Sequence, residues 1–207
     1  MEKLNSRKNS TRIFIVIGII FIILILFNQF SNNLSNYETR ILKQREAKNL
    51  NFKNNPRSPV PEEERATFVG LKYFQVDKSF APEATFSPAV FRDTLRLMTN
   101  TGEERLMINA GKVSFELKGK SYELSAFEVL GVLENSLFIP FTDETSGEES
   151  YGAGRYMDIP HDSEPFLVDF NTAYSPDCAY NPTSSCPIPP RENHIDIPVL
   201  AGEMDYK

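Results

Sequence analysis

The feature that most constrains this chain is an uninterrupted apolar run near its N-terminus. Residues 13–27 read IFIVIGIIFIILILF without one polar side chain, and the run extends to Phe30 if Asn28 and Gln29 lie at an interface. A helix that crosses a bilayer needs about 17–25 such residues, and a helix that is apolar on every side has no place on a domain surface. The run therefore predicts a transmembrane anchor over residues 13–30.

The residues on either side of the run set the expected topology. Residues 1–12 form a basic tail, which favours a cytoplasmic N-terminus and an extracytoplasmic position for everything after the run. A cleaved secretory signal is the alternative, since its apolar region has about 7–15 residues and ends in small side chains. Residues 28–32 offer no such cleavage site. We therefore expect a single-pass protein of the cytoplasmic membrane whose C-terminal domain is extracytoplasmic.

After the run we expect a spacer and then one domain. Residues 31–51 carry apolar side chains at helical spacing between charged ones, which predicts a short juxtamembrane helix. Prolines then break that helix, so that residues 31–63 form a helical spacer with a Pro-rich linker. The remaining residues 64–207 suffice for one hydrophobic core.

The charge of the chain excludes one class of partner. Residues 1–30 have a net charge of +3 and the whole chain has −6, so residues 31–207 have −9. Such an acidic region repels phosphate backbones, and no basic stripe follows it that could track a nucleic acid. We expect the membrane as a partner through residues 13–30, and no nucleic acid.

Short alternating segments predict a β-rich domain. The clearest signal is a hairpin in which residues 113–117 and 122–124 alternate around Lys118-Gly119-Lys120. Further strands are expected at residues 86–98, 105–108, 137–141, 150–159 and 166–170, with a turn at Asn109-Ala110-Gly111. From Tyr174 onward, six prolines predict irregular chain. The pattern predicts a mainly β domain, folded as an antiparallel barrel or sandwich.

Polar side chains in or beside these strands are the first site candidates. Four carboxylates could supply a pair for acid–base chemistry: Asp143, Glu144, Asp158 and Asp169. Arg155, which lies between two tyrosines, could bind an anion as a forked donor. Its structural alternative is an ion pair with Asp143 or Asp169.

The remaining motifs are incomplete. Gly152-Ala153-Gly154 lacks the third glycine and the following helix of a dinucleotide loop, so it indicates a β-bulge or a close strand crossing. Neither His161 nor His194 accompanies a recognisable nucleophile motif. We therefore expect no cofactor.

Two cysteines, Cys178 and Cys186, complete the set of reactive side chains. In an exported domain an isolated pair most often forms a disulfide, which is the state we predict. A metal site with His194 and Asp177 or Asp196 is an alternative, as are two free thiols. We expect no metal.

Four longer strings make the domain recognisable. They are KYFQVD at 72–77, FELKGKSYELSAFE at 115–128, LFIPFTDETSGEESYGAGRYMD at 137–158 and DFNTAYSPDCAYNPTSSCPIPPRENHIDIPVLAGE at 169–203. They resemble the bacterial and archaeal domain-of-unknown-function family 1684 over about residues 64–204. The residues that match its pattern are Phe141, Asp143, Thr145, Gly147, Tyr151, Gly152, Gly154, Arg155, Asp169, Phe170, Asn171, Tyr174, Cys178, Cys186, Pro189, Pro190, Asn193 and Glu203.

The resemblance implies no activity, since the family has none established. It does widen the set of candidate binding residues, which becomes Asp143, Tyr151, Arg155, Asp169, Asn171, Tyr174 and Asn193. Our first hypothesis is a binding or interaction module held at the outer face of the membrane. The second is a hydrolase-type enzyme that gathers Asp143, Tyr151, Arg155, Asp169 and Asn171 in one polar cleft.

Overall fold

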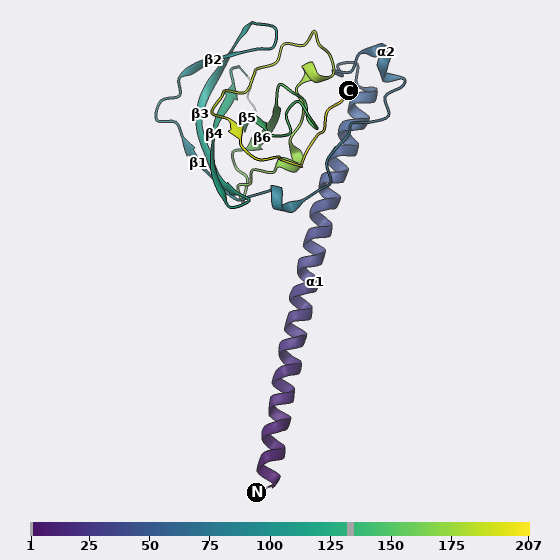
Figure 1. Cartoon of the computed structure of the whole chain (residues 1–207), viewed down its shortest axis with the longest axis vertical. Coiled ribbons are helices and arrows are strands. Elements are labelled where there is room, and N and C mark those ends of the chain that lie inside the picture. The colour runs from purple at the N-terminus through teal and green to yellow at the C-terminus, as the bar shows by residue number, and fades with distance from the viewer. Residues whose placement is uncertain (1, 132–134) are drawn as a thin grey trace. The chain divides into compact units, whose positions relative to one another are not determined.

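The computed structural model describes residues 2–131 and 135–207, which form two compact units, one up to Lys43 and one from Gln44. A single long helix, α1 (Glu2–Asn54), contains the first unit and enters the second (Figure 1). By length and composition its Ile19–Asn54 part could cross a membrane, a property that signal sequences near an N-terminus share. The predicted N-terminal apolar helix is therefore present.

The second unit is mainly antiparallel β structure. Its strands are β1 (Ala84–Pro88), β2 (Thr94–Met98), β3 (Glu104–Leu117), β4 (Lys120–Val129), β5 (Ser136–Asp143), β6 (Arg155–Pro160) and β7 (His194–Ile195), with one short helix, α2 (Glu62–Arg65), before them. Three 3₁₀ helices lie at Lys78–Phe80, Phe170–Thr172 and Asp177–Ala179. The strand order is β1-β3-β4-β5-β6, with β2 also paired to β3 and β7 added parallel to β5.

The predicted mainly antiparallel β structure is thus confirmed, and of the two predicted forms, barrel or sandwich, the barrel is wrong because the sheet is not closed. Among the described residues, β1 and β6 at the two ends of the strand path do not pair with each other. The chain after β6 contains only a two-residue strand. Its prolines cannot donate the ladder hydrogen bonds that closing strands need.

The β3–β4 hairpin forms where the sequence predicts it. Lys118 and Gly119 both have positive φ, 51° and 79°, and Leu117 pairs with Lys120 across the turn. Two central residues with positive φ match the right-handed twist of the flanking strands. Lys118 adopts this conformation without being glycine.

The predicted turn at Asn109-Ala110-Gly111 is wrong, because β3 continues through it as a β-bulge. The register with β4 shifts between Asn109 and Gly111, and Gly111 has φ 140°. A Cβ on Gly111 would lie 2.2 Å from the carbonyl oxygen of Ser87 in β1, so the close strand pairing requires glycine. One extra residue reverses the alternation of side chains, and Met107 and Val113 therefore join different clusters.

Three of the other expected strands differ in extent. The segment 86–98 is divided into β1 and β2, and the segment 150–159 becomes regular only at Arg155. In the segment 166–170, Leu167 forms a single bridge to Glu83 and no named strand. Asp169 there accepts a hydrogen bond from the Asn171 N–H and caps a 3₁₀ turn, which takes the chain out of extended conformation.

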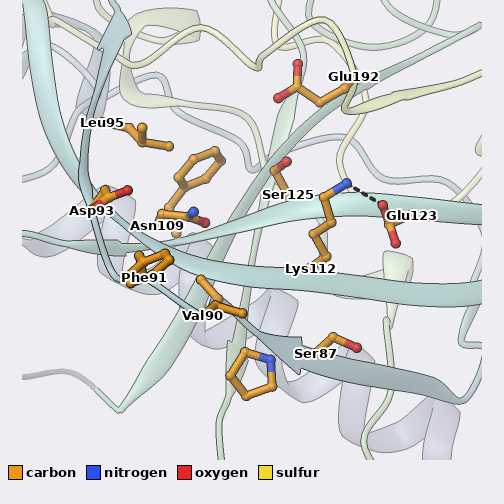
Figure 2. A pocket seen from close by; sticks show the side chains of 13 residues that line it. Ser87, Val90, Phe91, Asp93, Leu95, Asn109, Lys112, Glu123, Ser125 and Glu192 are labelled. Atoms are coloured by element: carbon orange, nitrogen blue, oxygen red, sulfur yellow. Dashed lines mark hydrogen bonds and ion pairs between the residues drawn. The ribbon is translucent and has the colours of Figure 1, made fainter.

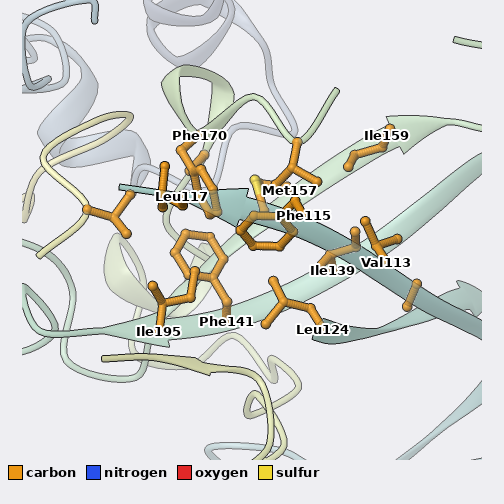
Figure 3. Packing of buried hydrophobic residues seen from close by; sticks show 14 of the residues in the cluster. Val113, Phe115, Leu117, Leu124, Ile139, Phe141, Met157, Ile159, Phe170 and Ile195 are labelled. Carbon is orange, nitrogen blue, oxygen red and sulfur yellow. The ribbon is translucent and has the colours of Figure 1, made fainter. Parts of the chain in front are cut away.

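The main core lies between the sheet and the C-terminal segment (Figure 3). The Phe170 ring packs edge-on against Phe141, with centroids 5.3 Å apart, and against Phe115 at 5.7 Å. In Figure 1 the yellow-green C-terminal chain lies within the curve of β3 and β4. It contributes Val168, Phe170, Ala173, Ile195, Val199 and Ala201 to this core.

The opposite face of the sheet carries a second, smaller cluster. Its buried members are Leu97, Met107, Phe127, Phe138, Tyr156, Cys178 and Cys186, with Tyr151 and Tyr174 packed against them. Because β5 supplies Ile139 to the first cluster and Phe138 to the second, both of its faces are buried. A third cluster joins Phe52 and Val60, from the expected linker region, to Phe68 and Tyr180.

Candidate functional site

Two of the candidate residues meet in a buried ion pair. Asp143 ends β5 and Arg155 begins β6, and the Arg155 Nη2 lies 2.8 Å from the Asp143 Oδ2 with both side chains almost fully buried. Asp143 also accepts hydrogen bonds from the backbone N–H groups of Thr145 and Val199. The expected structural alternative for Arg155, a pair with Asp143, is therefore the one that forms.

The two terminal nitrogens of the Arg155 guanidinium also hold the C-terminal segment, while its buried Nε has no hydrogen-bond partner. Its Nη2 donates to the Val199 carbonyl at 2.9 Å, and its Nη1 donates to the carbonyls of Ala201 and Glu203. One guanidinium thus satisfies three backbone acceptors and one carboxylate, which offsets the cost of burying its charge. These contacts link Arg155 and Asp143 to the carbonyls of residues 199, 201 and 203. We call this set of groups the Arg155 network.

Glu203 extends this arrangement to the end of α1. It is 2% exposed and forms an ion pair with Lys48, while Tyr180 and the Ser175 N–H donate to its second oxygen. Burial, followed by the charge of Glu203, raises the pKa of Tyr180 far above its ordinary value, so this phenol stays protonated. The C-terminal segment is therefore held in two ways: Arg155 binds its backbone carbonyls, and Lys48 and Tyr180 bind the Glu203 side chain.

Three other candidates bind backbone rather than facing a cavity. Asn171 exchanges hydrogen bonds with the N–H and carbonyl of Asp77, and Asp169 caps the turn beside it. Asn193 bonds the N–H and carbonyl of Ser125 and the Pro140 carbonyl. These contacts join segments that are distant in sequence.

Tyr174 and Tyr151 lie on the second face of the sheet, near the cysteines. Tyr174 is placed by a backbone bridge in which its N–H and carbonyl pair with Tyr156 of β6, at 3.0 and 2.8 Å. The Tyr151 hydroxyl donates to the Cys178 Sγ at 3.5 Å. The structure therefore separates the seven candidates into buried polar contacts and this tyrosine pair.

Beside the second cluster is a cavity of about 310 Å³, which we call the tyrosine cavity. Its lining residues are Arg105, Met107, Val129, Phe138, Tyr156, Asp158, Tyr174, Pro176, Asp177, Ser185, Cys186 and Pro187. The volume lies at the lower end of the range of about 300–1,000 Å³ that small-molecule sites occupy. Strands β3 to β6 supply one wall and the segment 174–187 supplies the other.

The wall combines aromatic faces with fixed polar groups. The Tyr156 ring stands edge-on to Phe138 and to Tyr174, with centroids 4.8 and 5.8 Å apart. The Tyr174 hydroxyl donates to Asp158 at 2.6 Å, and the Tyr156 hydroxyl donates to the Pro187 carbonyl. Burial raises the pKa of both phenols well above the ordinary value, and Asp158 adds to the effect on Tyr174. Both hydroxyls therefore remain donors at neutral pH.

Charge at the cavity is mixed. Arg105 is exposed and donates to the Ser185 carbonyl at 3.1 Å, which holds its guanidinium at the rim. Asp158 and Asp177 line the same cavity. The cavity therefore presents both signs of charge around an apolar and aromatic interior.

The predicted disulfide between Cys178 and Cys186 is not formed, because both side chains are free thiols. The backbone N–H of Cys178 donates to the Cys186 Sγ at 3.3 Å, so the pair is held by hydrogen bonds. The alternative metal site is not assembled either. Among the described residues, no three His, Cys, Asp or Glu side chains are grouped to hold an ion.

A second hollow, of about 590 Å³, is an open groove over β1, β3 and β4 (Figure 2). Val90, Phe91 and Leu95 give it apolar walls, and the Lys112–Glu123 ion pair lies at its far side. Val90 and Phe91 are 90% and 72% exposed, so much of the apolar wall of this groove is in contact with solvent.

Only part of the tyrosine cavity was predictable from the sequence. Tyr174, Asp158 and Cys186 were candidates for other reasons, whereas Arg105 and Met107 were not. The alternation of Tyr156 and Asp158 along β6 was the available signal for two of the lining positions. Nothing in the sequence marked Arg105 as a lining residue. Its position depends on the β-bulge, which reverses the face of the sheet toward which the side chains of β3 point.

Comparison with known proteins agrees with the resemblance seen in the sequence. Residues 66–204 match a family described as a protein of unknown function, DUF1684. The chain is similar to an uncharacterised protein of Haloarcula marismortui, whose solution NMR structure gives a TM-score of 0.66 at 37% identity, covering 84% of this chain and 96% of that one. No curated protein matches the sequence.

Proposed function

Since this chain belongs to the DUF1684 family of unknown function, we propose a function from its own surface: it is a small-molecule-binding module anchored to the cytoplasmic membrane and displayed outside it. The observation that carries the binding role is the tyrosine cavity. It unites an apolar and aromatic wall, two phenols fixed by hydrogen bonds to Asp158 and to the Pro187 carbonyl, and charges of both signs in one opening. Such a combination is typical of ligand sites.

The chemistry of the wall describes the ligand. Phe138, Tyr156 and Tyr174 suit a flat apolar or aromatic body, since offset and edge-on ring contacts add to the burial of area. Asp158 and Asp177 suit a ligand amine or hydroxyl that donates hydrogen bonds. The volume limits the ligand to the size of a small metabolite.

The anchor part of the proposal rests on residues 13–30. The apolar side chains of residues 19–27 are 43–67% exposed, which suits a helix surrounded by lipid rather than by protein. The basic tail before them favours a cytoplasmic N-terminus. The binding module would then lie outside the cell membrane.

Blocking the cavity tests the binding role. The full chain in detergent is screened by thermal shift against aromatic amines, phenols and monosaccharides, and compounds that raise the Tm are titrated. A compound present at 100 times its Kd stabilises the folded state by about 2.7 kcal/mol. Val129→Trp fills the cavity mouth and should abolish the shift.

The matched control for that variant is Leu106→Trp. Leu106 is about as exposed as Val129, 43% against 39%, but it does not line the cavity. It should leave every shift unchanged. Equal shifts in both variants, or no stabilising compound in the panel, would contradict the binding role.

A tag at Lys207 tests the anchor separately. Protease added to spheroplasts should remove the tag while the protein stays in the membrane pellet after alkaline washing. A soluble mature protein that begins near Ser31 would show a cleaved signal and refute the anchor, whatever the outcome of the binding screen.

A further inference from the structure

The two cysteines form a buried sulfur pair that the proposed ligand does not require. Cys178 and Cys186 are 5% and 7% exposed, and both are free. The Cys178 N–H points at one sulfur at 3.3 Å, and the Tyr151 hydroxyl points at the other at 3.5 Å. Donors aimed at sulfur favour the thiolate over the thiol and are typical of the surroundings of metal-bound cysteines.

We infer that Cys178 and Cys186 bind one monovalent soft metal ion of the Cu(I) and Ag(I) class between their two sulfur atoms. Thiolate sulfur is a soft ligand and selects such ions over harder ones. Ions of this class accept two ligands. The inference goes beyond the ligand proposed above and does not rest on it.

The number of ligands decides against zinc. A structural zinc site takes four protein ligands. Within the described part of the chain no third His, Cys, Asp or Glu side chain, Asp177 included, is grouped with the two cysteines to hold an ion. His194 is engaged with Thr142 and Glu144, and Asp196 with Lys120 and Tyr122. The sulfur pair is left with the ligand count that suits a monovalent ion.

The path from solvent to the two sulfur atoms and the charge around them also suit a monovalent cation. Cys186 lines the tyrosine cavity, which gives an ion a path to the pair. Binding releases the protons of both thiols to solvent, and two thiolates and one monovalent cation give a complex of charge −1. Arg105, at the rim of the same cavity, supplies a positive charge. Met107 lines the cavity too and belongs to the same packed cluster, so a thioether lies close to the path.

Metal titration of the full chain in detergent tests the inference. With Ag(I) as a redox-inert probe, native mass spectrometry should show one ion per chain, retained against a large excess of Zn(II). The double variant C178S/C186S should retain none. His194→Ala should still bind one ion, because His194 is not a ligand.

A measurement on the unmodified protein guards against a variant that fails to fold. X-ray absorption at the copper edge, after loading with Cu(I) under reducing conditions, should show sulfur as the nearest neighbours, with no nitrogen. A nitrogen neighbour, loss of the ion in His194→Ala, or a wild-type chain that retains no ion would overturn the site.

Discussion

At the scale of single residues, several of the candidate side chains fix backbone in or beside the C-terminal segment. Arg155 bonds three carbonyls of residues 199–203, and Glu203 accepts from the Tyr180 hydroxyl. Asn171 and Asn193 fix backbone in the same way. A buried charge keeps its position only while each of its partners remains.

Removing Arg155 should therefore cost much more than removing an exposed arginine. Arg155→Met leaves the Asp143 carboxylate buried without its partner, and we expect a loss of about 3–5 kcal/mol in the free energy of unfolding. The control is Arg96→Met, which breaks an exposed pair with Glu104 and should cost about 1 kcal/mol or less. Urea unfolding measures both; equal losses would refute the role of the network.

The low pKa of Cys178 predicts a pH-dependent contribution to stability. The pKa of this thiol is about 6 in the folded chain and has its ordinary value of 9 in the unfolded chain. Between these two pH values the unfolded state therefore binds more protons than the folded state. Stability from this group should rise with pH between about 6 and 9 and be lost as pH falls through 6.

Comparing wild type with Cys178→Ser isolates this contribution. The difference in free energy of unfolding between the two should increase from pH 6 to pH 8, measured by urea titration. A difference that is constant over this range would show that the folded thiol is not ionised.

At the scale of elements, two glycines explain how the strands come so close. Gly111 lets β3 approach β1 at the bulge, and Gly154 lets the start of β6 approach β5. At Gly154, with φ 90°, an added Cβ would lie 2.4 Å from the Phe141 carbonyl oxygen. The expected close strand approach at Gly152-Ala153-Gly154 is therefore located at its last residue.

Gly154→Ala should be considerably more destabilising than Gly102→Ala. Both glycines have positive φ, so both substitutions strain the backbone, but Gly102 has no atom within 4 Å of the new Cβ. The difference isolates the steric clash, which overpacking data place at about 1–3 kcal/mol. Thermal unfolding of the two variants provides the comparison, and similar losses in Tm would contradict the clash.

An element was predictable from the sequence when the residues that determine it are adjacent in the chain. The β3–β4 hairpin is specified by residues adjacent in sequence, so its alternation and turn were sufficient. Gly111 reads as a turn until β1 is placed against β3, because the close contact is with Ser87. The tyrosine cavity could not be predicted from the sequence for the same reason. Its lining residues Met107, Tyr156 and Cys186 come together only after the bulge, the sheet and the C-terminal segment have formed.

At the scale of the whole molecule, the C-terminal segment completes the structure instead of trailing from it. It supplies residues to the main core, one wall of the tyrosine cavity and the carbonyls that Arg155 binds. A segment with six prolines does this with only the two-residue strand β7, because hydrogen bonds from the Arg155 side chain to its carbonyls replace ladder bonds.

Removal of residues 201–207 should therefore prevent folding of the entire second unit. The truncated chain leaves Arg155 with fewer acceptors and deletes Glu203, the partner of Lys48 and Tyr180. Removal of Lys207 alone, which is exposed, should be neutral. Limited proteolysis distinguishes the two: a shortened chain as resistant as the full one would disprove the role of the terminus.

The sequence separation between Arg155 and its acceptors also orders the biosynthesis of this unit. Ala201 and Glu203 follow Arg155 by 46 and 48 residues. Strands β1 to β6 are therefore synthesised first and can begin to pair while Arg155 still lacks these carbonyls. A ribosome that pauses between the codons of Arg155 and Ala201 would hold a fragment whose main core is open, and chaperones and proteases would treat that fragment as unfolded.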